Sequence, residues 1–227
     1  LEGLDEDMIF RTPGMQYSLP QLQKAKSEGK IVTSELEVFF DICPCKIYAV
    51  TGSDGKTTTT TILSEFLRAE GYTVHLGGNI GKPLLQEIES IEKTDIAVAE
   101  LSSFQLISMR RSPDVAVVTN LSPNHLDWHR DMDEYIEAKK NIFLHQNAFS
   151  RTVRNADDAA TAAFLTENRG DCMLFSRKKC VSHGAWLEEG TSYVNSGKVL
   201  DLSDIRIRGD PNVENYLAAS CAVDGRQ

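Results

Sequence analysis

The chain has 227 residues, of which 41% are hydrophobic and 25% are charged, an ordinary composition for a soluble globular protein. With 33 acidic residues against 24 basic ones, the formal net charge is −9. That balance speaks against a nucleic-acid or anionic-membrane partner, which would need a basic patch. The sequence contains no run of about 18 apolar residues, so we expect no transmembrane helix. The first residues do not resemble a signal peptide. We therefore expect a cytoplasmic protein.

Five cysteines are spread irregularly along the chain, at Cys43, Cys45, Cys172, Cys180 and Cys221. Cys43 and Cys45 are separated only by Pro44, which is too close for an easy disulfide, and no matching second pair suggests zinc. Free cysteines are often simply buried. We expect reduced thiols that mostly serve as packing residues.

Short apolar runs alternate with helical periodicity along most of the chain, which predicts βα units on a mostly parallel sheet with helices on both faces. The expected strands are residues 8–10, 31–32, 46–51, 72–76, 96–99, 115–118, 152–153 and 173–175. The expected helices are residues 19–28, 34–40, 56–69, 132–145 and 213–223. Between residues 184 and 207, turns at Glu189-Gly190 and Asn195-Ser196-Gly197 predict a small antiparallel flap.

Cys43-Pro44 is the expected domain boundary. Residues 1–44 look like the tail of a preceding Rossmann-like α/β domain, and residues 45–227 would form the main α/β domain. The chain lacks an initiator Met, so we expect a fragment of a longer protein, with a linker to a further domain after the last helix.

The most informative motif is the segment 50–58, Val-Thr-Gly-Ser-Asp-Gly-Lys-Thr-Thr, between a buried strand and a helix. A helix N-terminus offers N–H groups and a positive dipole end to phosphate, and glycines let the backbone wrap an anion. Lys56 would reach the β and γ phosphates, and the Thr57 hydroxyl would ligate Mg²⁺. Val50 stands where the usual phosphate loop has Gly, so this is a variant, and an ordinary Gly-rich turn is the alternative.

Two further candidates follow buried strands, at the sheet edge where parallel α/β proteins bind ligands. Glu100 would supply a hard oxygen ligand for Mg²⁺, the alternative being a helix cap. His125 is favoured as an active-site ligand, whereas His129 is expected to lie behind it or at the surface. Zinc is disfavoured, because the pair has no Glu between its members and no third ligand.

The sequence gives less support to the other histidines and to Lys139 as site residues. His75, His145 and His183 have no supporting context and are expected to be structural or surface residues. Lys139 lies on the helix that follows the His125 loop. By pattern alone, Lys139 is a solvated charge on a helix face.

Seven motifs in this order resemble those of the Mur ligase family. They are residues 51–58, Gly77-Gly-Asn-Ile-Gly81, Glu100-Leu-Ser-Ser-Phe-Gln-Leu106, Asn120-Leu-Ser-Pro-Asn-His-Leu-Asp127, Tyr135-Ile-Glu-Ala-Lys139, Asn155-Ala-Asp-Asp158 and Asn212-Val-Glu-Asn215. The resemblance covers the end of the family's N-terminal UDP-binding domain and its whole central P-loop-type ATPase domain. The family's C-terminal domain would be absent.

The resemblance implies roles for individual residues. The nucleotide would be held by Gly52, Ser53, Asp54, Gly55, Lys56, Thr57, Thr58, Asn79, Asn212 and Asn215, and the UDP-muramoyl substrate by Thr12, Pro13, Gly14, Asn79, Ser102, Gln105 and His125. Two Mg²⁺ ions would be held by Thr57, Glu100, His125 and Lys139. Lys56, His125 and Lys139 would be catalytic. Lys139 would be the lysine that the family carbamylates, which reverses the solvated-charge interpretation.

The second and third motifs point to the branch of the family that adds D-glutamate, whereas other branches share the phosphate loop and the His125 loop. The implied reaction is ATP-dependent: the carboxylate of UDP-N-acetylmuramoyl-L-alanine attacks the γ-phosphate, giving an acyl phosphate and ADP. The D-glutamate amine then attacks, giving an amide and phosphate. Such an enzyme serves peptidoglycan precursor synthesis and is expected to be a monomer. This fragment by itself is expected to be inactive.

Other interpretations remain open. One is another amino-acid ligase of the same fold, similar to folylpolyglutamate synthase, and another is a non-enzymatic nucleotide-binding module. Several residues also depart from the family pattern, namely Asp54, Asn124, Trp128, Arg130 and Pro211. Pro211 replaces a His usually found before Asn212, which concerns one contact on the adenine side. No departure removes a phosphate- or metal-binding group.

Overall fold

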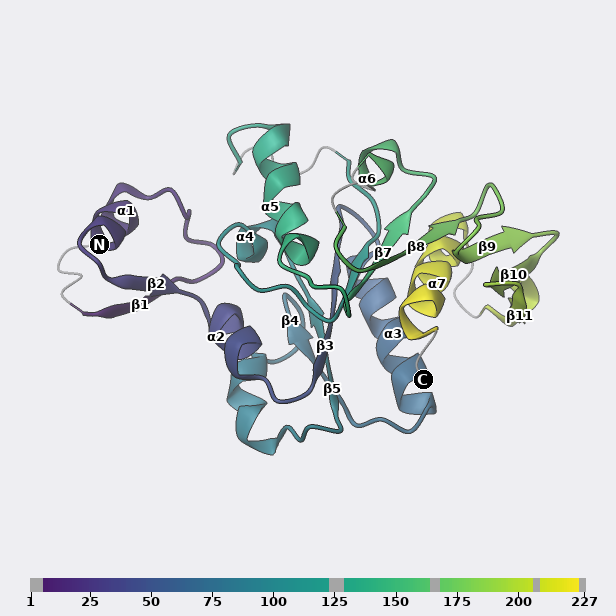
Figure 1. Cartoon of the computed structure of the whole chain (residues 1–227), viewed down its shortest axis with the longest axis horizontal. Coiled ribbons are helices and arrows are strands. Elements are labelled where there is room, and N and C mark those ends of the chain that lie inside the picture. The colour runs from purple at the N-terminus through teal and green to yellow at the C-terminus, as the bar shows by residue number, and fades with distance from the viewer. Residues whose placement is uncertain (1–5, 123–128, 164–167, 206–208, 225–227) are drawn as a thin grey trace.

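The structure, a computed structural model, describes residues 6–122, 129–163, 168–205 and 209–224 (Figure 1). Its main element is a nine-stranded sheet in the order β11-β10-β9-β8-β7-β6-β3-β5-β4. The strands are β3 (Lys46–Thr51), β4 (Val74–Gly78), β5 (Ile96–Glu100), β6 (Val115–Val118), β7 (Arg151–Asn155), β8 (Asp171–Ser176), β9 (Gly184–Glu188), β10 (Thr191–Val194) and β11 (Gly197–Asp201). Every neighbouring pair from β4 to β9 is parallel, which confirms the predicted fold class.

The strands at the centre of this sheet are buried on both faces, as their continuous apolar sequences predict. β3 lies between β5 and β6, with Tyr48 opposite both Val98 and Val115. All five residues of β5 are buried, and so are all four of β6. Because β3 is paired on both sides, the backbone at its two ends is held firmly in place.

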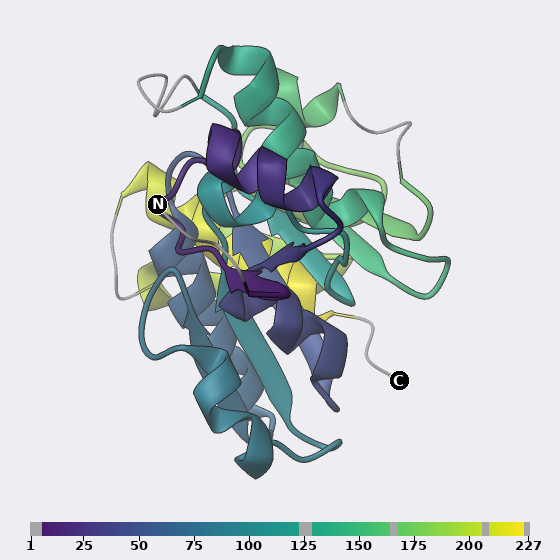
Figure 2. The ribbon, with the colours of Figure 1, turned by 90° about the vertical axis from the view of Figure 1, so that its left-hand side faces the viewer.

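Helices cover both faces of the sheet, making three layers (Figures 1 and 2). On one face, α3 (Lys56–Ala69) and α7 (Asp210–Val223) share a core cluster with the sheet. On the other face lie α2 (Glu35–Ile42), η1 (Leu84–Ser90), α4 (Ser103–Leu106) and α5 (Met132–Leu144). The short helix α6 (Ala159–Ala162) follows β7, and the 3₁₀ turn η3 (Leu202–Asp204) follows β11. None of the described helices is long and apolar enough to cross a bilayer.

The N-terminal part is a small separate βαβ unit. β1 (Met8–Phe10) and β2 (Ile31–Thr33) form a parallel two-stranded sheet, joined by α1 (Pro20–Ser27). The next helix, α2, packs on the large sheet, and its Phe39 is fully buried in the same cluster as Ala97 of β5. A helix that precedes the predicted boundary at residue 44 thus shares the core of the main domain. The boundary itself stays a prediction.

The expected strands and helices are present, with shifted ends. The predicted helix from residue 213 begins at Asp210, because proline is well tolerated in the first turn of a helix and Pro211 lies there. The predicted antiparallel flap is confirmed as β9, β10 and β11, but β9 pairs with β8, so the flap extends the large sheet. η1, α4 and α6 were not predicted, since each is too short to show helical periodicity.

Candidate active site at the carboxyl end of the parallel strands

The loop between β3 and α3 needs glycine at two positions. Gly55 is the residue before α3 and has a left-handed backbone, with φ +77°. A Cβ atom on Gly55 would collide with the side-chain amide of Asn215, and one on Gly52 would collide with Thr119. The loop can therefore pass close to its neighbours only without these side chains. It leads directly into the N-terminus of α3, a geometry that suits an anion.

Residues that follow β6 hold this loop in place. Asn120 accepts hydrogen bonds from the amides of Ser53 through its carbonyl and of Asp54 through Oδ1, both at 2.9 Å. The Ser53 hydroxyl also lies 2.8 Å from the Tyr135 hydroxyl on α5. Neither Asn120 nor Tyr135 was predicted as a site residue from the sequence. The signal for Asn120 was its position two residues after a buried strand.

The Lys56 ammonium lies at the loop itself. Its Nζ donates to the Ser53 carbonyl at 2.9 Å. Lys56 is itself the first residue of α3, so its ammonium adds a positive charge beside the amides of the loop.

Glu100 ends β5 and is almost completely buried, with 1% of its surface exposed. Its Oε2 accepts from the Thr57 hydroxyl at 2.7 Å, and its Oε1 accepts from the Asn79 amide at 2.9 Å. The helix-cap alternative for Glu100 is wrong, because the cap of α4 is Ser102. A buried carboxylate beside a threonine hydroxyl is a pair of hard oxygen ligands, which fits Mg²⁺.

Lys139 is the clearest case of a residue that pattern alone misplaces. Its side chain is only 3% exposed, and Nζ donates to the Thr51 hydroxyl at 3.1 Å and to the Gly52 carbonyl at 2.7 Å. Burial, and then the nearby charge of Lys56, lowers the pKa of Lys139 to about 7. The solvated-charge interpretation is therefore wrong: α5 directs this lysine under the phosphate loop.

The predicted His125 lies outside the described residues. His129 is buried, its Nε2 lies 2.8 Å from the Ser103 hydroxyl, and its ring stacks on Phe104. The surface alternative for His129 is therefore wrong, and its place behind His125 stays a prediction. His75 is held between Glu87 and Asp95 by contacts of 3.3 and 3.0 Å, in keeping with a structural role.

The asparagines predicted for the adenine side lie against the first turns of α3. The buried Asn215 accepts from the Thr59 hydroxyl at 3.0 Å, and its amide donates to Asn212 Oδ1 at 3.4 Å. Both come from α7, so this helix and the phosphate loop form one continuous corner of the site.

Part of the predicted substrate set lines one cavity of about 290 Å³. Thr12 and Pro13 contribute from the N-terminal unit, and Gln105 contributes from α4. Gln105 also forms a capping box with Ser102, whose hydroxyl accepts from the Gln105 amide at 3.3 Å. Gly14, the third residue of the predicted loop, is exposed and has open space around its Cα.

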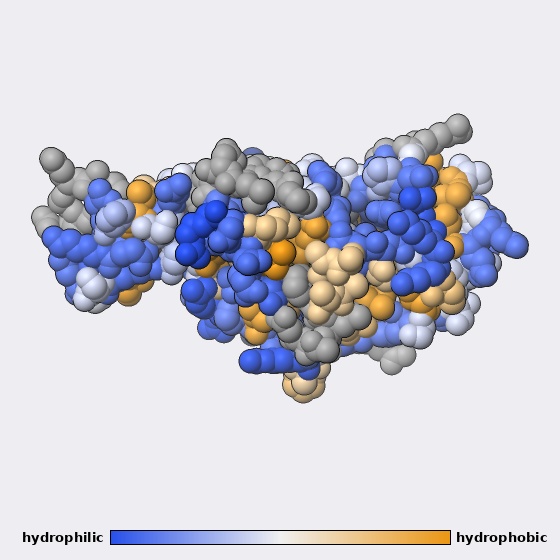
Figure 3. Space-filling model, turned by 90° about the horizontal axis from the view of Figure 1, so that it is seen from above, coloured by the Kyte–Doolittle hydropathy of each residue, from blue (hydrophilic) through white to orange (hydrophobic). Residues whose placement is uncertain are grey.

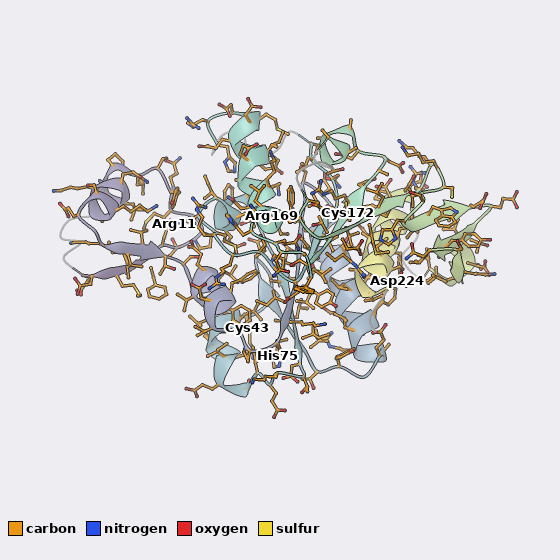
Figure 4. All side chains as sticks on the ribbon, viewed as in Figure 1. Arg11, Cys43, His75, Arg169, Cys172 and Asp224 are labelled. Atoms are coloured by element: carbon orange, nitrogen blue, oxygen red, sulfur yellow. The ribbon has the colours of Figure 1, made fainter. Side chains whose placement is uncertain are left out.

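Arg11 is a residue of this region that the sequence analysis missed. Its guanidinium is buried and donates to the carbonyls of Met15 and Phe104 and to the Ser108 hydroxyl, at 3.0, 2.9 and 3.0 Å. It therefore ties the Thr12 loop to α4 of the main domain, and Figure 4 shows it between these parts. The available signal was an arginine directly before the Thr-Pro-Gly loop.

The face seen in Figure 3 is mostly hydrophilic, with small hydrophobic patches between the charged residues.

Comparison with known proteins identifies the family of this chain. The family model described as the Mur ligase middle domain matches residues 50–223. A UDP-N-acetylmuramoylalanine--D-glutamate ligase from Acetivibrio thermocellus is 54% identical over 221 residues, covering 96% of this chain and 47% of the relative. One from Clostridium tetani is 51% identical over 217 residues, with the same coverage.

Solved structures share the fold at low identity. A UDP-N-acetylmuramate:L-alanyl-gamma-D-glutamyl-meso-diaminopimelate ligase from Neisseria meningitides has a TM-score of 0.67 at 16% identity, covering 97% of this chain and 75% of that one. A UDP-N-acetylmuramate-alanine ligase from Thermotoga maritima has a TM-score of 0.58 at 22% identity, covering 96% and 51%. The chain spans about half the length of the curated relatives it matches. On the family match and these relatives, the chain belongs to the Mur ligase family.

Proposed function

We propose that this chain provides the ATP site and part of the muramoyl-substrate site of a ligase that joins D-glutamate to UDP-N-acetylmuramoyl-L-alanine. The observation that carries the proposal is the convergence of Lys56, Thr57, Glu100 and Lys139 on one loop. The relatives that are 49–54% identical bear the name of that ligase. Residues 1–44 would be the end of a UDP-binding domain, and residues 45–227 the central ATPase domain of a monomeric protein.

In the first step, a carboxylate oxygen attacks the γ-phosphorus of ATP, the bond to the β-phosphate oxygen breaks, and an acyl phosphate and ADP result. Two anions must approach one another, so positive charge at the loop is the main requirement. Lys56 and the amides at the start of α3 would neutralise the phosphates. The D-glutamate amine then displaces phosphate from the acyl carbon, forming the amide.

Magnesium would be held by Thr57 and Glu100, the adjacent pair of oxygen ligands, and His125 would take part at a second ion. The ions supply charge neutralisation at the transferring phosphate. Glu100 itself is oriented by Asn79, so its carboxylate is already directed to the loop. The cavity lined by Thr12, Pro13 and Gln105 would receive the UDP-muramoyl part.

Lys139 is proposed to carry a carbamate. A neutral amine is required, because the nitrogen lone pair attacks carbon dioxide, forming an N–C bond and releasing one proton. With its pKa lowered to about 7, about half of the Lys139 side chains are neutral at pH 7. Carbon-13 NMR in labelled bicarbonate should show a carbamate signal that Lys139→Ala lacks and that Lys140→Ala, its partly exposed neighbour, retains.

ADP release by the full-length ligase tests the reaction. The assay would contain Mg-ATP and UDP-N-acetylmuramoyl-L-alanine, with and without D-glutamate. Release that depends on D-glutamate, and that other amino acids do not support, is the expected result. Release with L-glutamate and a folate acceptor instead would favour the folylpolyglutamate synthase-like alternative, and nucleotide binding without any release would favour a binding module.

A further inference from the structure

Cys43 and Cys45 present their sulfur atoms side by side, at a distance of 3.6 Å. They lie in the connection between α2 and β3, with Cys43 partly exposed and Cys45 buried. All four of Cys43, Cys45, Cys180 and Cys221 direct their thiols at backbone carbonyls, but only Cys43 and Cys45 have a sulfur–sulfur contact among these contacts. The Cys43–Cys45 pair is thus a dithiol in which one residue, Cys43, is partly exposed.

The backbone holds this dithiol in its geometry. Pro44 has a fixed φ and restricts Cys43 to the extended conformation, which the structure shows at φ −60° and ψ 124°. Cys45 leads directly into β3, and the next residue, Lys46, is already paired with Ile96 of β5. Because a rigid backbone already holds the two sulfurs in place, little conformational entropy is lost when they bind one centre.

The sulfur separation indicates which ligand the pair fits. Two sulfurs bound at about 2.3 Å to one trivalent, pyramidal centre, with a bond angle of about 100°, lie about 3.5 Å apart, close to the distance found here. A disulfide would need the sulfurs to approach to about 2.05 Å against the rigid proline. Among the described residues, no group of three or more His, Cys, Asp and Glu side chains could hold a metal ion. The best ligand is therefore a thiophilic centre that needs only two protein sulfurs and brings its own third substituent.

The chemistry of the thiols agrees with this geometry. The hydrogen bond from Cys45 lowers the pKa of Cys43 to about 7, although burial opposes it. The same contact, and then burial, raises the pKa of Cys45, which keeps its proton. Cys43 is therefore a nucleophilic thiolate in part at neutral pH, and Cys45 is a thiol that can donate a proton. His75 lies near Cys43 in Figure 4 and adds a weak favourable influence.

We propose that Cys43 and Cys45 form a chelating site for trivalent organic arsenicals. Two arsenic–sulfur bonds form and the two arsenic–hydroxyl bonds of the hydrated arsenical break. The hydroxyls leave as two water molecules, taking the proton of Cys45 and the proton of Cys43 or one from solvent. The arsenic stays trivalent, so no oxidant or reductant is needed.

The site is distinct from the phosphate loop. It lies at the amino end of β3, whereas the loop follows the carboxyl end, and six residues of strand span about 20 Å. An arsenical on the dithiol should therefore leave nucleotide binding unchanged. The proposal does not depend on which reaction the ligase catalyses.

Native mass spectrometry of the chain with phenylarsine oxide tests the proposal. We expect one phenylarsenic adduct per chain, with the loss of two titratable thiols. The adduct should be removed by 2,3-dimercaptopropanol and should resist an equal concentration of 2-mercaptoethanol. Cys43→Ser and Cys45→Ala should each weaken binding by about 10²-fold, because chelation is lost. Cys172→Ser and Cys180→Ser are the matched controls and should retain the adduct.

Three outcomes would overturn the proposal: no adduct on the unmodified chain, an adduct that persists in Cys43→Ser, or an adduct that the monothiol removes. Because Cys45 is buried, its variant could unfold. The partly exposed Cys43 then provides the decisive variant, with thermal unfolding of both recorded alongside. A fall in ADP affinity on arsenical binding would place the reagent near the phosphate loop and contradict the proposed location.

Discussion

The two ends of the parallel strands treat buried charge differently. At the carboxyl end, Glu100 is bound by neutral donors and Lys139 by neutral acceptors. At the amino end, His75 lies between Glu87 and Asp95, so opposite charges can face one another. A buried charge without an opposite partner costs stability. We expect the carboxyl end to carry that cost because its charges would meet a ligand, whereas the charged contacts of His75 at the amino end contribute to folding.

The largest effect should come from Lys56, which follows the carboxyl end of β3, and Lys46 at the amino end of the same strand is its control. Lys56→Ala removes the ammonium at the phosphate loop and should lower ligase turnover by at least about 10²-fold, the scale of one lost electrostatic stabiliser. Lys46→Ala, at the exposed amino end of the same strand, should change turnover by less than twofold. Steady-state ADP release by the full-length ligase measures both. Near-normal turnover in Lys56→Ala would disprove the assignment of the loop.

Replacing two glycines of similar backbone conformation by alanine distinguishes the cost of backbone strain from the cost of a steric clash. Gly55 and Gly71 both have positive φ, +77° and +94°, but only at Gly55 would a Cβ atom meet a neighbour. Gly71→Ala should cost about 1 kcal/mol of unfolding free energy, from backbone strain alone. Gly55→Ala should cost about 2–3 kcal/mol, because Asn215 must also move, and should weaken ADP binding. Urea unfolding and calorimetry measure the two quantities, and equal costs would refute the tight fit.

The pKa of Lys139 predicts a pH dependence of stability. In the unfolded chain this lysine has its ordinary value of 10.5, and in the folded chain about 7. Between these values the unfolded state binds the additional proton, so the free energy of unfolding should rise by up to about 1.4 kcal/mol per pH unit from pH 7 to 10.5. The contribution is constant outside that window.

Lys139→Met isolates this contribution. In buffers free of carbon dioxide, the variant should gain stability relative to the unmodified chain as the pH falls from 10.5 to 7. Urea unfolding at each pH gives the difference. Parallel stability curves for the two proteins would mean that Lys139 has an ordinary pKa in the folded state.

The contrast between the two ends also explains what the sequence could predict. β6 is apolar throughout and β5 is apolar up to its last residue, Glu100, so the positions of both strands and of that carboxyl edge follow from local pattern. Lys139 could not be placed this way, because whether a lysine on α5 faces water or the loop depends on how the helix packs on the sheet. Only the resemblance to a family identified it.

The same limit applied to Arg11 and to the short helix α4. Arg11 is buried through contacts with Phe104 and Ser108, which are more than 90 residues away in the chain. No pattern within a window of sequence carries such a contact. α4 has four residues, which are too few to show helical periodicity in the sequence. Ser102 and Gln105 do, however, have the spacing of a capping box.

The smallest effect that we predict concerns Ser102. This serine is assigned two roles, one in folding and one in substrate binding. Ser102 caps α4, and its change to Ala should lower the free energy of unfolding by about 1 kcal/mol. Asp131 caps α5 by accepting from the Glu134 amide at 2.8 Å, and its change to Ala should lower the free energy of unfolding by the same amount. If Ser102 also contacts the substrate, Ser102→Ala alone should raise KM for UDP-N-acetylmuramoyl-L-alanine by about 3- to 10-fold, the scale of one hydrogen bond. An unchanged KM in a correctly folded Ser102→Ala ligase would assign this serine to the helix cap only, and the cavity contact to Gln105.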